Sequence, residues 1–229
     1  MKISCLGVDI ENGKIKYQDE RLVKLTEKFD PKKISPFFAE FVGENFSGSD
    51  CIIVARDKIL DFLIMDMEKV DTRMNNTKDE AEKKIWQKLQ QYLEKEVPVC
   101  DIEFNAEEFS KVKELAPLSL KPTLVVEGEI EINDLIIQAF SKSGMMFFYT
   151  AGKKEVRSWP VKKNSDIITC AGKIHSDLAR GFIKAEIINF KDFINFHNMQ
   201  EAKANGLVKL VDRDYIVQEG DIIDIRFNV

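Results

Sequence analysis

The segment from Gly7 to Lys14 comes nearest in this chain to a loop that holds a phosphate group. A phosphate loop follows the pattern G-x-x-x-x-G-K-[ST], because its backbone N–H groups wrap the phosphates and its last hydroxyl reaches Mg²⁺. Here five residues separate Gly7 from Gly13 where the motif has four, and Ile15 stands at the hydroxyl position. No helical pattern follows to aim its N-terminus at an anion. The sequence therefore predicts that this segment is not a working phosphate loop.

The cysteines and histidines show neither metal-site nor disulfide spacing. No CxxC pair occurs, and the histidines lie far from every cysteine except Cys170. Zinc sites need closely spaced ligand pairs, so we expect no metal, no cofactor and buried thiols in a reducing cytosol. His175 has no partner at catalytic spacing, which favours a hydrogen-bonded structural histidine over a ligand or a base. The residues considered are Cys5, Cys51, Cys100, Cys170, His175 and His197.

Basic side chains gather toward the C-terminal end. Residues 145–229 hold nine Lys and four Arg against seven Asp and four Glu, a balance of +2 in a chain of net charge −5. Such side chains on a sheet face neutralise phosphates, and Trp159 or Phe182, if exposed, would stack on bases. The alternative is a solvated charged surface around a buried Trp. The candidate RNA- or ribosome-binding residues are Lys153, Lys154, Arg157, Lys162, Lys163, Lys173, His175, Arg180 and Lys184.

The composition is that of a soluble globular protein, with 44% hydrophobic and 32% charged residues in 229. No apolar run approaches the roughly 20 residues that a membrane span needs. The first residues lack the long apolar region of a signal peptide. We therefore expect a cytoplasmic protein without a membrane partner.

Alternation and turn residues predict strands in the N-terminal part. Residues 2–8 begin as a strand, and the Asn12-Gly13 turn joins it to residues 15–17 as a β-hairpin. Residues 21–29 predict a short helix. Further strands are expected at residues 35–42, 50–55 and 122–126, and a further helix at residues 132–140.

The middle of the chain predicts an antiparallel helical hairpin of about 40 residues. Its first helix carries apolar residues at spacings of three and four, a coiled-coil-like seam. Residues 77–80 predict a capping box that starts the second helix. The stripe is either core packing or the face of an arm that reaches a partner. The seam residues are Leu60, Leu63, Met67, Val70 and Met74.

The C-terminal part predicts a compact α+β fold. Strands are expected at residues 146–149, 156–161, 183–190, 215–217 and 222–227, and helices at 176–179 and 199–205. The last two strands flank Glu219-Gly220-Asp221, which predicts a hairpin turn.

Five blocks in this part closely resemble the C-terminal TGS domain of the YchF (Obg-like) ATPase family. They are FFYTAG at 147–152, EVRSW at 155–159, AGKIHSD at 171–177, RGFIKAE at 180–186 and DYIVQEGD at 214–221, followed by RFNV at 226–229. The resemblance implies a β-grasp fold, which threonyl-tRNA synthetases and stringent-response enzymes also contain. Upstream, residues 19–36 look like the segment after the family's first switch, and residues 56–94 are similar to its inserted helical arm.

The departures from the family fall at nucleotide contacts. The resemblance predicts a phosphate loop, a second switch and an Asn-rich base-reading turn. The chain has residues 11–14, 43–46 and 127–129 there instead. Glu127 and Glu129 would also repel phosphate. These departures therefore predict a degenerate relative that is not an enzyme.

The resulting expectation is an α+β protein in three parts. A reduced α/β G-domain remnant covers residues 1–55 and 116–144, with a helical arm at residues 56–115 inserted as an antiparallel hairpin. A TGS-like β-grasp domain covers residues 145–229. The expected function is non-catalytic binding of RNA or the ribosome in translation or stress regulation. Residual ATP or GTP binding and a protein partner held by the arm are the alternatives.

Overall fold

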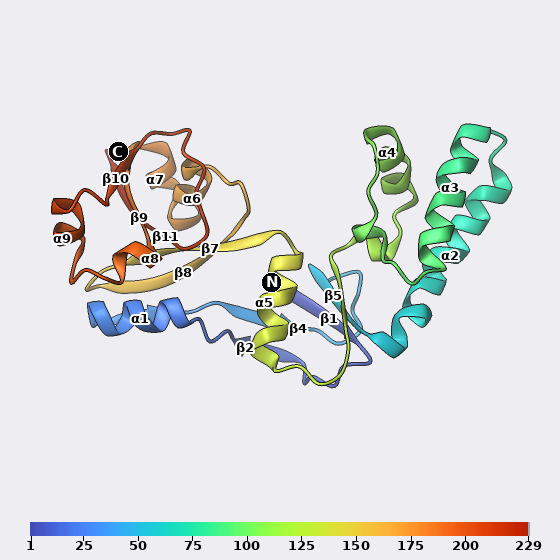
Figure 1. Cartoon of the computed structure of the whole chain (residues 1–229), viewed down its shortest axis with the longest axis horizontal. Coiled ribbons are helices and arrows are strands. Elements are labelled where there is room, and N and C mark those ends of the chain that lie inside the picture. Colours follow the sequence, from blue (N-terminus) through green and yellow to red (C-terminus); the bar gives the residue numbers. More distant parts are fainter. Residues whose placement is uncertain (229) are drawn as a thin grey trace. The chain divides into compact units, whose positions relative to one another are not determined.

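The computed structural model describes residues 1–228 and divides into two compact units (Figure 1). Unit 1 comprises Met1–Ile15 and Ala39–Ser143. Unit 2 comprises Lys16–Phe38 and the residues from Gly144 onward. The structure thus groups residues 16–38 with the C-terminal part, whereas the sequence-based expectation placed them in the N-terminal remnant. Neither unit is one continuous stretch of chain.

Unit 1 is built on a five-stranded sheet of order β2-β4-β1-β5-β6. The pairs β1–β4, β1–β5 and β5–β6 are parallel. Strand β4 lies between β1 and β2, so the predicted β-hairpin of these two strands is wrong. The alternation of apolar and polar residues identified the strands, but it does not determine which strands pair with each other. The strands are β1 (Lys2–Leu6), β2 (Gly13–Lys16), β4 (Phe38–Phe41), β5 (Cys51–Ala55) and β6 (Thr123–Val126).

Helix α5 (Ile132–Lys142) packs on β5 and β6. Leu135, Ile136, Ala139 and Phe140 are buried on one helical face, as their spacing predicts. Both flanking strands are themselves almost wholly apolar, which is typical of strands in a covered parallel sheet.

The helical part of unit 1 follows β5. Helices α2 and α3 are consecutive and pack together, as the hairpin prediction requires. Their core also takes in Ile52 and Val54 of β5 and Val112 of α4, while Leu60 of the predicted seam is 45% exposed. The helices therefore share a globular core, and the coiled-coil prediction is not supported. The elements are η1 (Arg56–Lys58), α2 (Ile59–Asn76), α3 (Glu80–Leu93), η2 (Val99–Asp101), α4 (Ala106–Leu115) and η3 (Leu118–Leu120).

The start of α3 differs from the predicted capping box. Asp79 is the N-cap, and its side chain accepts a hydrogen bond from the Ala81 N–H. Thr77 instead ends α2, and its hydroxyl donates to the Glu82 carboxylate at 2.7 Å. Arg73 donates to the same carboxylate at 3.0 Å. Glu82 therefore joins the end of one helix to the start of the next.

Glu82→Gln is expected to destabilise unit 1 at neutral pH and to make little difference in acid. The Thr77 hydroxyl first, and Arg73 next, hold the pKa of the Glu82 carboxyl below its usual 4.5. The charged form therefore stabilises the folded state above pH 4.5, and this contribution is lost as pH falls through the lowered pKa. Thermal unfolding followed by Trp86 fluorescence in a Trp159→Phe background, at a series of pH values, measures this contribution. Glu80→Gln, with a side chain 79% exposed on the same helix, is the control. A constant difference at all pH values would contradict the assignment.

Unit 2 is built on a six-stranded sheet of order β10-β9-β11-β7-β8-β3. The hairpin β7–β8 and the pair β9–β11 are antiparallel, while β11–β7 and β3–β8 are parallel. Helices α6 and α7 pack on β8, β9 and β11, and α1 packs on β7 and β8 (Figure 1). The strands are β3 (Lys33–Ser35), β7 (Met145–Ala151), β8 (Glu155–Lys162), β9 (Phe182–Asn189), β10 (Lys209–Val211) and β11 (Asp221–Phe227). The helices are α1 (Glu20–Phe29), α6 (Ile167–Ile174), α7 (Ser176–Arg180), α8 (Phe190–Phe193) and α9 (Met199–Ala204).

The predicted strand at residues 215–217 is wrong, and so is its hairpin with β11. Ile216 forms only an isolated bridge with Asp166. Asp221 fixes the turn before β11, because its buried carboxylate accepts hydrogen bonds from the Tyr215 hydroxyl and the Gln218 N–H. These hydrogen bonds hold residues 215–221 in a turn, so residues 215–217 do not form a strand of the sheet.

Residues 16–38 attach to the sheet of unit 2 through polar and aromatic contacts. The hydroxyl of Tyr149, a fully buried side chain, donates to Asp19 Oδ2 at 2.7 Å. Asp19 also caps α1. Tyr17 stacks on Phe147, with ring centroids 5.7 Å apart. Asp19 and Tyr149 lie 130 residues apart in sequence, so this attachment was not predictable from local patterns.

Candidate functional site

A hollow in unit 1 lies where three parallel strands end. Gly7 follows β1, Arg56 follows β5 and Glu127 follows β6, and all three residues line a pocket of about 1230 Å³. Ligands of open parallel sheets bind outside the carboxyl ends of the strands. The position of this pocket therefore makes it the candidate small-molecule site of unit 1.

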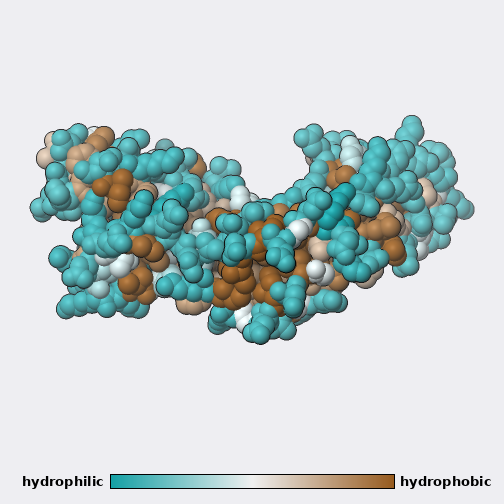
Figure 2. Space-filling model, turned by 60° about the horizontal axis from the view of Figure 1, so that its bottom comes forward, coloured by the Kyte–Doolittle hydropathy of each residue, from teal (hydrophilic) through white to brown (hydrophobic). Residues whose placement is uncertain are grey.

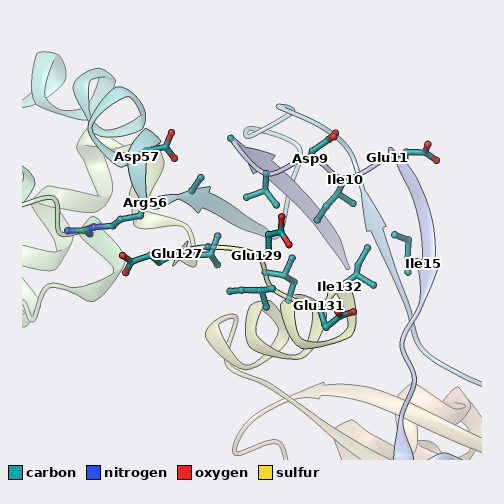
Figure 3. Close-up of a pocket in the computed structure, with 17 residues that line it drawn as sticks. Asp9, Ile10, Glu11, Ile15, Arg56, Asp57, Glu127, Glu129, Glu131 and Ile132 are labelled. Atoms are coloured by element: carbon teal, nitrogen blue, oxygen red, sulfur yellow. The ribbon is translucent and has the colours of Figure 1, made fainter.

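The pocket has an apolar interior and an acidic rim. In Figure 3, Ile10, Ile15 and Ile132 point toward its middle, while Arg56 points away toward the helices. Arg56 is paired with Glu96 at 3.0 Å, and none of the 17 lining residues is a lysine. In Figure 2, apolar surface gathers over the part of unit 1 that holds the sheet and α5. The acidic lining residues are Asp9, Glu11, Asp57, Glu127, Glu129 and Glu131.

The turn at Gly7 follows β1 and lies against the start of η1. Gly7 has φ of 72°, and a Cβ there would lie 2.6 Å from Lys58 Cγ, so the turn packs tightly against the start of η1. The chain then runs to β2, and the next helix, α1, starts only at Glu20 in unit 2. The Gly7 turn therefore leads into a strand and not directly into a helix. Any nucleotide phosphate bound in this pocket would need its charge neutralised by a cation.

No group of three or more His, Cys, Asp or Glu within residues 1–228 is arranged to hold a metal ion. Burial raises the pKa of the Cys5 thiol to about 12 and that of Cys51 to about 11. Both thiols therefore stay protonated at neutral pH, unlike reactive or metal-binding thiolates. Within the same range, no helix is long and apolar enough to cross a membrane.

The predicted RNA-binding residues all lie in unit 2, but they do not form one cluster. Lys153 and Lys154 lie at the turn of the β7–β8 hairpin, and Lys162 and Lys163 lie at the opposite end of β8. Arg157 lies between them on β8. Eight strand residues span roughly 23 Å, so the two lysine pairs are separate surfaces.

The remaining predicted residues lie on helices or are paired with acids. Lys173 is in the last turn of α6. His175 caps α7, where its Nδ1 accepts the Asp177 N–H, so the structural role expected for it is present. Arg180 pairs with Asp177 at 3.0 Å and Lys184 with Asp212 at 3.2 Å.

Neither aromatic residue that was considered for base stacking is open to a base. Trp159 is 8% exposed and Phe182 is 5% exposed. The Trp159 indole donates to the Thr150 hydroxyl, and the Arg157 guanidinium covers the ring at 3.7 Å. Sequence analysis also missed Lys32 and Lys33. They are 120 residues from the β7–β8 turn in sequence, yet the structure places them beside it.

Comparison with known proteins identifies relatives over most of the chain. The family model YchF-GTPase_C, described as a protein of unknown function (DUF933), matches residues 145–228. "Ribosome-binding ATPase YchF" of Bacillus subtilis is 28% identical over 330 residues, covering 97% of this chain and 90% of that protein. Its namesake in Mycoplasma genitalium is 34% identical over 163 residues, covering 68% of this chain and only 42% of that protein.

The fold also has a solved relative. The Schizosaccharomyces pombe YchF GTPase superposes with a TM-score of 0.75 at 18% identity, covering 96% of this chain and 88% of that one. The mixed α/β architecture of this chain is therefore that of a YchF GTPase structure.

The relatives overturn one prediction. The sequence predicts a degenerate family member that is not an enzyme, but both of these curated relatives carry the name ATPase, so this prediction is wrong. The absence of a recognisable loop motif does not remove the chain from a family named for nucleotide hydrolysis. From the C-terminal family match and the alignment over 97% of its length, the chain belongs to the YchF family.

Proposed function

We propose that this chain binds the ribosome. The observation that carries the proposal is its similarity to relatives named ribosome-binding ATPases, which extends over 97% of the chain. The family match falls on residues 145–228, in the unit that holds all the basic candidate residues. Electrostatic attraction to phosphates supplies much of the affinity of proteins for nucleic acid, so a basic surface there supports the proposal.

The expected arrangement within unit 2 is a TGS-like β-grasp domain. The sheet of unit 2 supports this proposal. Its central pair, β11–β7, is parallel and has antiparallel neighbours, and α6 and α7 cover the sheet. Ribosome binding would in turn place the protein in the cytoplasm. Lys162, Lys163, Lys173, His175, Arg180 and Lys184 remain candidate contacts of this unit.

Co-sedimentation of the full chain with ribosomes tests the proposal. We expect the protein in the ribosomal pellet at low salt and its progressive release as salt is raised, because counterions compete for the phosphates. Recovery of the chain only in the supernatant at low salt would refute ribosome binding.

A second candidate function is nucleotide binding in the unit 1 pocket. Its place at the carboxyl ends of β1, β5 and β6 favours this function, and the names of the relatives agree with it. Because the rim is acidic, we propose that ATP or GTP enters as its Mg²⁺ complex. The metal then supplies the positive charge that the lining residues lack.

A thermal titration tests nucleotide binding. ATP or GTP with Mg²⁺ is expected to raise the unfolding temperature reported by Trp86, since a ligand of the native state stabilises by mass action. EDTA should abolish the shift. Glu129→Lys places a cation on the rim, so it should make binding less dependent on Mg²⁺. The absence of any shift at millimolar nucleotide with Mg²⁺ would exclude this second function.

A further inference from the structure

Two segments distant in sequence bring basic side chains together at one end of the unit 2 sheet. Strand β3 pairs in parallel with β8, with Lys33 opposite Glu155. The Lys32 N–H donates to the Lys153 carbonyl at 3.1 Å, which fixes the chain before β3 to the β7–β8 turn. We call this surface the lysine corner, defined by Lys32, Lys33, Lys153, Lys154 and Arg157.

The lysine corner keeps a positive charge after its internal pairing. Its lysine side chains are exposed, and Arg157 is half-buried. The neighbouring carboxylate, Glu155, accepts hydrogen bonds from Lys33 at 3.0 Å and from the Ser35 hydroxyl at 2.5 Å. Ser35 first and Lys33 next hold the pKa of Glu155 below its usual value, so this group carries one negative charge at neutral pH. Together with Asp224, which lines the adjoining hollow, two carboxylates stand against five basic residues, and the surface is therefore suited to a polyanion.

A hollow adjoins the lysine corner on the same face of the sheet. Alternate residues of β8 share a face, which puts Glu155, Arg157 and Trp159 together. The hollow has a volume of about 560 Å³ and lies between the β7–β8 turn, β11 and helices α6 and α7. Lys153 and Lys154 line its edge. Apolar side chains form its interior, namely Trp159, Ile174, Leu178, Ile223, Ile225 and Phe227.

Flat polar and aromatic groups are available at the mouth of this hollow. Phe227, at the end of β11, is 47% exposed. The Arg157 guanidinium, which is not itself a lining residue of the hollow, lies 3.7 Å over the ring of Trp159, which is one. Unpaired RNA bases stack on aromatic rings and on Arg guanidinium planes, while their phosphates contact Lys and Arg.

We propose that the lysine corner and the adjoining hollow bind a single-stranded segment of RNA. The phosphates lie along Lys32, Lys33, Lys153 and Lys154, and one unstacked base enters the hollow beside Phe227. An acidic peptide matches the charge but not the apolar, aromatic-edged hollow, so RNA fits more of the surface. The inference rests on the proposed ribosome binding and assigns that contact to ribosomal RNA.

Fluorescence anisotropy of the full chain with a short, labelled, unstructured RNA tests the proposal. The double variant Lys153→Glu/Lys154→Glu is expected to weaken binding at least tenfold and to flatten the dependence of affinity on salt. The matched control is Lys191→Glu/Lys209→Glu, which reverses the same number of exposed charges elsewhere in unit 2, in α8 and in the opposite edge strand β10. We expect it to change affinity by less than about threefold.

A second variant separates base stacking from general electrostatics. Phe227→Ala keeps every charge of the lysine corner but removes the ring on which the base would stack. Stacking of one base increases the affinity for RNA by about fivefold or more. It should weaken RNA binding without changing the salt dependence. Circular dichroism of each variant checks that unit 2 is folded.

Three outcomes would overturn the inference. The first is equal weakening by the two double variants, and the second is an unchanged affinity of Lys153→Glu/Lys154→Glu. The third is displacement of the RNA by polyglutamate at equal charge concentration, which would assign the surface to an acidic peptide. If the Lys153→Glu/Lys154→Glu variant still sediments with ribosomes as wild type does, the RNA inference fails while the proposed ribosome binding stands.

Discussion

Asp66→Ala is expected to lower the free energy of unfolding of unit 1 by about 3 kcal/mol. The Asp66 side chain is fully buried, and its carboxylate accepts the N–H groups of Leu118 at 2.6 Å and Ser119 at 2.8 Å. Residue Pro117, at the N-cap of η3, offers no side-chain hydrogen bond. Asp66 of α2 therefore caps η3 from another element. Its removal leaves two amides without an acceptor, one of them in a fully buried residue.

The chain's two tryptophans make this prediction measurable unit by unit. Trp86 lies in unit 1 and Trp159 in unit 2, so urea unfolding in a Trp159→Phe background reports on unit 1 alone. Asp61→Ala, on the same helix with a side chain 63% exposed, is the control and should cost under about 0.5 kcal/mol. Equal midpoints for Asp66→Ala and its parent would show that this carboxylate does not support η3.

Tyr149→Phe is expected to destabilise unit 2 by about 2 kcal/mol. The substitution keeps the buried ring and removes the hydroxyl that donates to Asp19 at 2.7 Å. Asp19 is 5% exposed, so water does not readily replace the lost donor. Burial first, and the Asp19 charge next, raise the pKa of Tyr149, so the hydroxyl remains a donor throughout the range in which the protein is studied.

Unfolding followed by Trp159 in a Trp86→Phe background measures this loss. Tyr17→Phe is the matched control, because its ring keeps its stacking on Phe147. The free energy of unfolding of unit 2 in the Tyr17→Phe variant is expected to stay within about 0.5 kcal/mol of the value in its parent. A similar loss in both variants would mean that the Tyr149–Asp19 hydrogen bond has no special part in attaching α1.

Local patterns predicted elements better than their pairing. Helix α1, strand β5 and the strands β7, β8, β9 and β11 follow alternation or helical spacing, because each buries one face or both. The hairpin of β1 with β2 failed because β4 takes the place between them. That choice depends on contacts far apart in the chain, and a local pattern holds no information on them.

The sites divide in the same way. Glu127 and Glu129 were recognised as unfavourable to phosphate, and both lie on the rim of the unit 1 pocket. The carboxylates of Asp9 and Asp57 were missed, since only the parallel pairing of β1 with β5 brings them to that rim. The sequence signal that could have found them is that Asp9 and Asp57 each come shortly after the end of a predicted strand.

The discontinuity of unit 2 has a consequence for synthesis of the chain. Residues 16–38 leave the ribosome before the strands on which they pack. The hydrogen-bond donor to Asp19, Tyr149, is synthesised 130 residues later. At typical elongation rates this delay is on the order of 10 seconds. During that time Leu22 and Leu25 of α1, buried in the finished protein, have no sheet to cover them. This nascent segment is therefore a candidate client for a chaperone at the exit tunnel until the later strands of unit 2 have been made.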